Sequence, residues 1–93
     1  MNQISSNSLI EQLIRDIHAE LKRRGWTLRQ LADLLNISYI HMASMSSGAR
    51  KLSGLSIDKQ RKLAEFLGIS LVEFYIRCGV LQPEDIVKHL YAK

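Results

Sequence analysis

Residues 27–48 have the sequence TLRQLADLLNISYIHMASMSSG, and this stretch decides the fold. Thr27 and Gln30 have the spacing of a capping box, in which two side chains satisfy backbone amides at the start of a helix. Leucines then recur at helical spacing as far as Asn36, a residue type that tolerates the left-handed conformation with which helices end. The first half of the stretch is therefore predicted to be a short amphipathic helix.

The second half carries the signals of another short helix, over residues 38–47. Ser38 can cap its start, and Gly48 is expected to end it. Met42 and Met45 share one side of this helix, which predicts that they face the core. Two helices that meet around a turn of a few residues form a helix-turn-helix, whose second helix can enter the major groove of DNA.

The ordered set of these residues resembles the helix-turn-helix of phage-repressor-like regulators of the Cro/XRE type. The residues that carry the resemblance are Leu31-Ala32, Asn36-Ile37-Ser38, Met42, Met45 and Ser47-Gly48. The segment KLAEFLGISLVEF (residues 62–74) is similar to the fourth and fifth helices of that fold, so the resemblance spans about residues 20–76. It implies a lambda-repressor-like, all-α fold and a DNA-binding transcriptional regulator, with repression favoured over activation.

The rest of the chain is also predicted to be helical. In total we expect six helices and no strands, in a single domain over residues 1–93. The first helix is expected to run from a Ser8–Glu11 capping box to about Arg24. The fourth is expected to be capped by Ser56 and to end at Leu67, and the fifth to run from a Ser70–Glu73 capping box to near Gly79. A sixth is expected over Pro83–Tyr91. The sixth helix belongs to a C-terminal extension, residues 80–93, beyond the resemblance.

Composition places the protein in the cytoplasm. A single cysteine excludes an intrachain disulfide and fits a reducing compartment. No apolar run approaches the ~20 residues of a membrane span, and the polar start MNQISSNS lacks the order of a signal peptide. We therefore expect a cytoplasmic protein with no membrane partner.

Positive charge is concentrated around the helix-turn-helix. Residues 22–62 contain only two acidic residues, Asp33 and Asp58, whereas both ends of the chain are slightly acidic. The basic residues in this range are Lys22, Arg23, Arg24, Arg29, Arg50, Lys51, Lys59, Arg61 and Lys62. A surface that binds the DNA backbone requires this clustering, although lysines on small proteins often form only a solvated face.

The resemblance implies that exposed residues of helix 38–47 read DNA bases. These residues are Ser38, Tyr39, Ile40, Ala43 and Ser44. The helix lacks arginine, lysine, glutamine and asparagine, the side chains that give bidentate base contacts. Apolar contacts with thymine methyl groups and indirect readout of DNA shape would remain, which predicts a preference for T-rich half-sites.

Phosphate contacts are expected beside the reading helix. A helix N-terminus offers free amides and a positive dipole end, and the loop after the reading helix carries basic side chains. The predicted phosphate-binding residues are Thr27, Arg29, Gln30, Arg50, Lys51 and Lys59. Arg23 and Arg24 end the first helix, where cations also complement the helix dipole, so a structural role is as well supported for them as a DNA contact.

Members of the resembled family usually dimerise, which would place two reading helices about one DNA turn apart over a palindromic operator. One candidate interface is helix five with the extension: Phe74, Tyr75, Val80, Leu81, Ile86, Val87, Leu90 and Tyr91. Another is the apolar stripe of the first helix: Leu9, Ile10, Leu13, Ile14, Ile17 and Leu21. The extension could instead only cover the core of one domain.

The apolar reading helix also supports an alternative function. Tyr39 and Ile40 exposed together would make a small hydrophobic anchor for a protein, as in an adaptor or the antitoxin of a toxin–antitoxin pair. A regulatory protein partner is compatible with either function. Catalysis is not expected, because the histidines are widely separated and Cys78 lies in an apolar run. No metal site and no cofactor are predicted.

Overall fold

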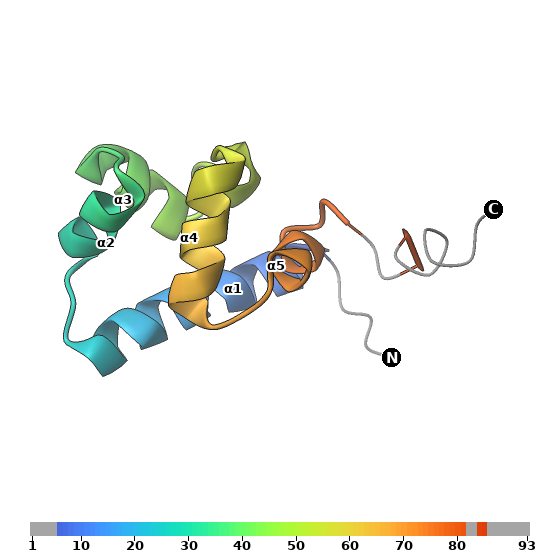
Figure 1. The fold of residues 1–93 in the computed structure, drawn as a ribbon, viewed down its shortest axis with the longest axis horizontal. Helices are drawn as coiled ribbons and strands as arrows, with labels where there is room; N and C mark the ends of the chain where they lie inside the picture. The colour runs from blue at the N-terminus through green and yellow to red at the C-terminus, as the bar shows by residue number, and fades with distance from the viewer. Residues whose placement is uncertain (1–5, 82–83, 86–93) are drawn as a thin grey trace.

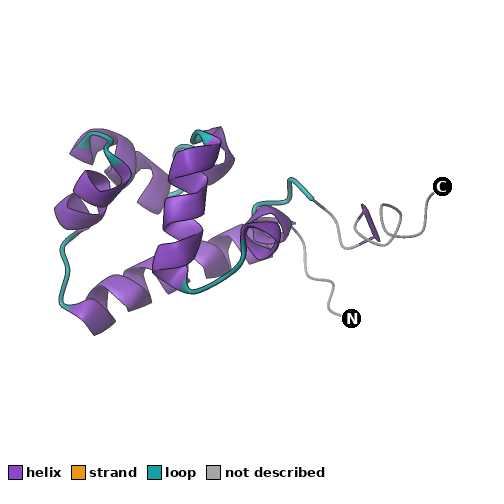
Figure 2. Cartoon of the chain, in the orientation of Figure 1, coloured by secondary structure: helices purple, strands orange, loops and turns teal. Residues whose placement is uncertain are grey.

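The computed structural model describes residues 6–81, 84 and 85. This part of the chain is all-helical, as the sequence predicted, with five α-helices packed around one core (Figures 1 and 2). The helices are α1 (Ser6–Arg24), α2 (Leu28–Leu35), α3 (Tyr39–Ser46), α4 (Ile57–Leu67) and α5 (Leu71–Arg77), with a 3₁₀ turn, η1 (Leu52–Gly54), between α3 and α4. The predicted sixth helix lies, apart from residues 84 and 85, outside the described residues.

The arrangement separates two ends of the molecule. The α2–α3 pair lies at one end and α5 at the other, with α1 running beneath both (Figure 1). α4 packs against α1, α2 and α5, and so ties the two ends together. None of the helices in the described part of the chain is long and apolar enough to cross a membrane.

The helix boundaries follow the capping residues in most places, with three corrections. Ser56 stands at the N-cap position of α4, but its side chain makes no capping hydrogen bond. α1 begins at Ser6, so Ser8 lies within the helix and is not its N-cap. Other capping-type residues precede Ser8 in the sequence, and the first turn of a helix is the part that local signals fix least. At α5 only half of the predicted capping box forms: Ser70 accepts from the amide of Glu73, whereas the Glu73 carboxylate pairs with Arg77 at 2.8 Å.

The core takes side chains from all five helices. Its fully buried members are Leu13, Ile17, Leu31, Leu35, Met42, Met45, Leu63 and Phe74. Burial of Met42 and Met45 confirms the predicted inner side of α3, and each such side chain contributes about 1.5–3 kcal/mol to folding. Leu13, Ile17 and Phe74 belonged to the two candidate dimer interfaces. Because they are fully buried within one chain, none of the three can contact a second copy.

Candidate nucleic-acid interface

The connection between α2 and α3 is fixed by local hydrogen bonds. Thr27 Oγ1 accepts from the amide of Gln30 at 3.2 Å, and Gln30 Oε1 accepts from the amide of Thr27 at 2.7 Å, which completes the predicted capping box. Asn36 ends α2 in the left-handed region, with φ of +56°. Ser38 then accepts from the amide of His41 at 3.0 Å and starts α3. The turn therefore sets the orientation of α3 relative to α2.

The predicted base-reading residues differ in how far they are exposed. Ile40 is 76% exposed and Tyr39 43% exposed, and Ser38 is also exposed. Ala43 and Ser44 are half-buried. The first turn of α3 is therefore its most accessible part, and Ala43 and Ser44 in the second half expose less surface for the predicted base contacts.

An arginine of α2 lies over the aromatic ring of α3. The Arg29 guanidinium carbon is 4.6 Å from the centre of the Tyr39 ring, a cation–π contact that contributes about 0.5–1 kcal/mol at an exposed site. The sequence placed Arg29 among the phosphate contacts and Tyr39 among the base contacts, and gave no signal that the two side chains touch. The turn brings them together and so holds a cation beside the exposed start of α3.

The basic loop after α3 is anchored at both ends. The carbonyl oxygen of Ser44 accepts from the amides of Ala49 and Arg50, at 2.8 and 3.1 Å. At the far end, Gln60 of α4 is buried and its Nε2 donates to the carbonyl oxygens of Ser53 (3.0 Å) and Leu55 (2.9 Å). Sequence reasoning missed Gln60, because nothing local marks a glutamine in an amphipathic helix as buried.

Arg50 and Lys51 lie in this anchored loop, and both are exposed. Their position next to the end of α3 agrees with the predicted phosphate-binding role. Thr27 and Gln30 fit that role less well, because each uses its amide within the capping box. A phosphate at the start of α2 would have to approach the other amides of the first turn.

Lys59 has a partner within the protein. Its Nζ donates to the carbonyl oxygen of Asn36 at 3.3 Å, so α4 holds the C-terminal end of α2. A cation beside the carbonyls that end a helix is a favourable arrangement. Lys59 therefore supports the turn, and only its remaining donor hydrogens are available for the phosphate contact that the sequence predicted.

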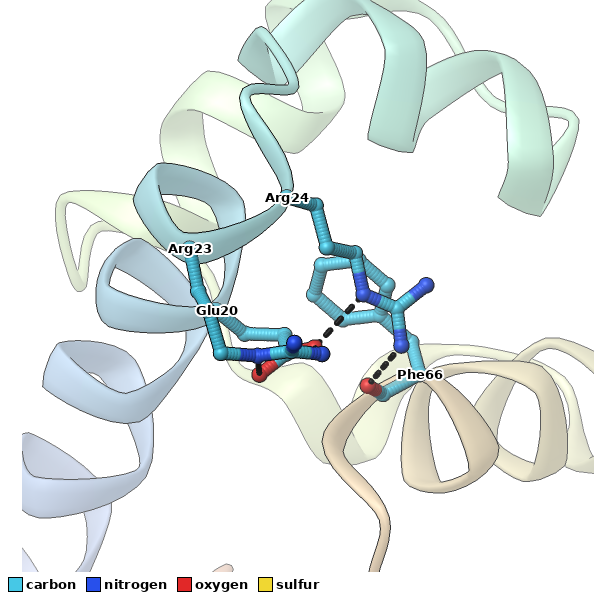
Figure 3. Close-up of polar contacts among 4 residues, drawn as sticks. All are labelled: Glu20, Arg23, Arg24 and Phe66. Atoms are coloured by element: carbon cyan, nitrogen blue, oxygen red, sulfur yellow. Dashed lines mark hydrogen bonds and ion pairs between the residues drawn. The ribbon is translucent and has the colours of Figure 1, made fainter.

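Arg23 and Arg24 form a separate cluster at the end of α1, drawn in Figure 3. Arg24 Nε pairs with Glu20 at 2.6 Å, and Arg24 Nη2 donates to the carbonyl oxygen of Phe66 at 2.8 Å. The Arg24 guanidinium also lies over the Phe66 ring, 4.3 Å from its centre. Arg23 Nε donates to the Glu20 carboxylate at 2.9 Å. Of the two roles left open by the sequence, the contacts of Arg24 favour the structural one.

Hydrogen bonds from these two arginines lower the pKa of Glu20 to about 2. Among residues 6–81, 84 and 85, the basic partners in salt bridges are Arg23, Arg24 and Arg77. Within the same residues, no salt bridge involves Arg29, Arg50 or Lys51. Arg29, Arg50 and Lys51 therefore keep their charge available to a ligand, as do the exposed Lys22, Arg61 and Lys62, which form no salt bridge in these residues either.

Two observations concern nucleophilic catalysis and metal binding. Burial raises the pKa of the Cys78 thiol to about 11, so this thiol is protonated at neutral pH and is a poor nucleophile. In the described part of the chain, no three His, Cys, Asp or Glu side chains are placed to hold a metal ion.

No protein-family model matches the chain, and neither a curated protein nor a solved structure shows significant similarity to it. The resemblance to phage-repressor-like regulators therefore stays a prediction.

Proposed function

We propose that this chain is a cytoplasmic transcriptional regulator, more specifically a repressor, that binds double-stranded DNA with α3 in the major groove. The α2–α3 pair would then be the helix-turn-helix of a lambda-repressor-like fold. One observation carries the proposal: a turn fixed by caps presents Tyr39 and Ile40 outward with Arg29 over the Tyr39 ring, the loop after α3 carries Arg50 and Lys51, and none of these three cations forms a salt bridge in the described residues.

The base contacts follow from the chemistry of the exposed first turn. Ile40 offers an apolar surface that complements the thymine methyl group, and the Tyr39 hydroxyl can donate or accept one hydrogen bond. Neither gives bidentate readout. We infer that T-rich half-sites are preferred and that DNA shape supplies a large part of the specificity.

The phosphate contacts follow from the position of the free cations. Arg50 and Lys51 lie in the loop after α3, and Arg29 lies at the start of α2 on the Tyr39 ring. A protein that neutralises phosphates with such side chains releases counterions, so its affinity falls steeply as salt rises. Two copies on an inverted repeat would place two α3 helices in successive turns of the major groove.

A salt series tests the proposal. We expect the affinity of the full chain for a labelled mixed-sequence duplex to fall steeply with salt. In the variant R50A/K51A the slope of log affinity against log salt should be shallower by about two units. The matched control is Arg23→Ala, which removes an arginine that is paired with Glu20 and should leave the slope unchanged. A wild-type slope near zero would contradict the proposal.

A second candidate function has one observation in its favour. Tyr39, Ile40 and Leu34 are large apolar side chains exposed on α2 and α3, as expected of a surface that anchors a protein partner. An adaptor or an antitoxin acting through such a partner would lose little affinity for it as salt rises. The slope of the salt series therefore separates the two functions.

A further inference from the structure

A glutamine of α4 is buried beneath the loop that follows α3. Gln60 is 4% exposed, and its Nε2 donates to the carbonyl oxygens of Ser53 and Leu55, at 3.0 and 2.9 Å. Both amide hydrogens are thus used on the loop. Oε1 of the same side chain is buried, and within the described part of the chain it has no hydrogen-bond partner. One half of this amide is therefore fully bonded and the other half is unpaired.

The unpaired oxygen makes glutamine an unfavourable residue for this position unless its donors are needed. A buried acceptor without a partner loses its hydrogen bonds to water and gains none in the protein. Methionine has a similar length and would fill the same space without that loss. Glutamine differs from such an apolar residue by the two hydrogen bonds that it makes to the loop.

The bonded carbonyls belong to the turn that carries the basic residues. Ser53 lies in η1, and Lys51 is the residue before η1 begins. The carbonyl oxygen of Lys51 accepts from the amide of Gly54 at 3.1 Å, and the amide of Arg50 is bonded to the end of α3. The backbone around the two cations is therefore fixed, while the side chains of Arg50 and Lys51 remain exposed.

Apolar packing also holds this loop, but it does so less specifically. Leu52 and Leu55 are buried in the core. Because the hydrophobic effect is non-directional, their burial keeps the turn close to the core without setting its orientation. Hydrogen bonds depend on direction as well as distance, so two of them to carbonyls one residue apart do set the orientation.

We propose that Gln60 is a positioning residue for DNA binding: by holding η1, it keeps Arg50 and Lys51 where they meet the phosphate backbone. The inference rests on the proposed function, in which these two cations contact phosphates. A loop that is ordered before binding loses less conformational freedom on the duplex than a mobile loop, so its contacts yield more affinity. Gln60 acts through the loop and does not itself touch DNA.

The hold on the loop is tested without DNA, by limited proteolysis with trypsin, which cuts after the two basic residues of the loop. Gln60→Met removes the donors and keeps the length of the side chain. We expect loop cleavage at least about 10-fold faster than in the wild type, with cleavage at the end of α1 unchanged. The matched control is Gln12→Met, because Gln12 is exposed and its Nε2 bonds Asp16 within α1. Gln60→Leu replaces Gln60→Met if the latter does not fold.

The positioning role is tested by a double-mutant cycle on the affinity of the full chain for a labelled mixed-sequence duplex at low salt. Gln60→Met should weaken binding about 10-fold in the wild-type background. In the R50A/K51A background the same change should weaken binding by less than about twofold, because the loop has no charge left to place. A purely structural role of Gln60 would not depend on the two cations in this way.

Three results, each with a wild type that binds DNA and loses affinity steeply with salt, would overturn this inference alone. Equal loop cleavage in the wild type and Gln60→Met would show that burial of Leu52 and Leu55 is enough to order the loop. Faster cleavage with unchanged affinity would show that the order of the loop does not affect DNA binding. Equal losses of affinity in both backgrounds would show that Gln60 supports the fold as a whole. A wild type that does not bind the duplex would instead overturn the proposed function, and this inference with it.

Discussion

Two arginine-rich regions of the molecule differ in what their charges do. At the end of α1, Arg23 and Arg24 share the Glu20 carboxylate, and Arg24 also bonds the Phe66 carbonyl oxygen (Figure 3). Around α3, Arg29 makes a cation–π contact with the Tyr39 ring, and Arg50 lies exposed in the loop. The first region uses its charge to hold α1 against α4, and the second leaves its charge for a ligand.

The difference shows that a count of basic residues overstates a binding surface. Between residues 22 and 62 the sequence has nine basic residues and two acidic ones, yet Glu20, just outside that range, neutralises part of this excess. A charge paired at about 3 Å presents little field to a ligand beyond a Debye length of roughly 10 Å. The face built by α2, α3 and the following loop is therefore the one to test for DNA binding.

The largest effect is expected from an acidic substitution on the α3 face, the surface built by α2, α3 and the loop that follows α3. Ile40→Glu places a carboxylate at an apolar position that is 76% exposed on the first turn of α3, where it would repel phosphate. We expect DNA affinity to fall at least about 100-fold, while the melting temperature stays near that of the wild type, since surface changes are usually within about 0.5 kcal/mol. The measurement is a binding titration at low salt.

The matched control for this change is Val72→Glu, which adds the same charge at an exposed apolar position of α5. It should leave DNA affinity within a few-fold of the wild type. Equal losses in the two variants would show that only net charge matters and would remove the distinction between the two regions.

A smaller effect is expected from breaking the α1 cluster. Arg24→Ala removes the hydrogen bond to the Phe66 carbonyl oxygen and the contact with its ring, and should lower the free energy of unfolding by about 1–3 kcal/mol in urea titrations. DNA affinity of the folded variant should not change. Arg23→Ala, an exposed control beside it, should have little effect on either quantity. Lost DNA affinity at unchanged stability in Arg24→Ala would contradict its structural role.

The smallest effect is expected when the pH is lowered and the stability of the fold is measured. Arg23 and Arg24 lower the pKa of Glu20 from 4.5 to about 2, so the folded state favours the ionised carboxylate. The stability that results is fully present above pH 4.5 and is lost as the pH falls from there towards 2. Glu20→Gln should therefore show a weaker loss of stability across this range than the wild type, measured by thermal melts. Parallel loss in both proteins would mean that the pairing does not survive in solution.

Much of the fold could be predicted from the sequence because its signals are local. The capping box of Thr27 and Gln30, the left-handed Asn36 and the N-cap Ser38 each act within four residues, and all three are present as predicted. The helical spacing of Met42 and Met45 was also enough to place both in the core. The error at the start of α1 arose where several capping residues compete.

The candidate site was less predictable because its contacts join distant parts of the chain. Arg24 bonds a carbonyl 42 residues away, and Lys59 bonds one 23 residues away, so neither role has a mark in the neighbouring sequence. The contact of Arg29 with Tyr39 depends on the angle between α2 and α3. Sequence reasoning grouped Arg29, Tyr39 and Lys59 around the turn but could not foresee which of them contact other parts of the protein.

The most direct test of DNA binding by the α3 face is selection from a pool of random duplexes at two salt concentrations, with sequencing of the retained DNA. The account predicts enrichment of a short, T-rich inverted repeat, retention that falls steeply as salt rises, and loss of both in Ile40→Glu. Retention without an enriched sequence would contradict specific readout by α3. No retention at low salt would contradict DNA binding itself and would favour the protein-binding function of Tyr39 and Ile40.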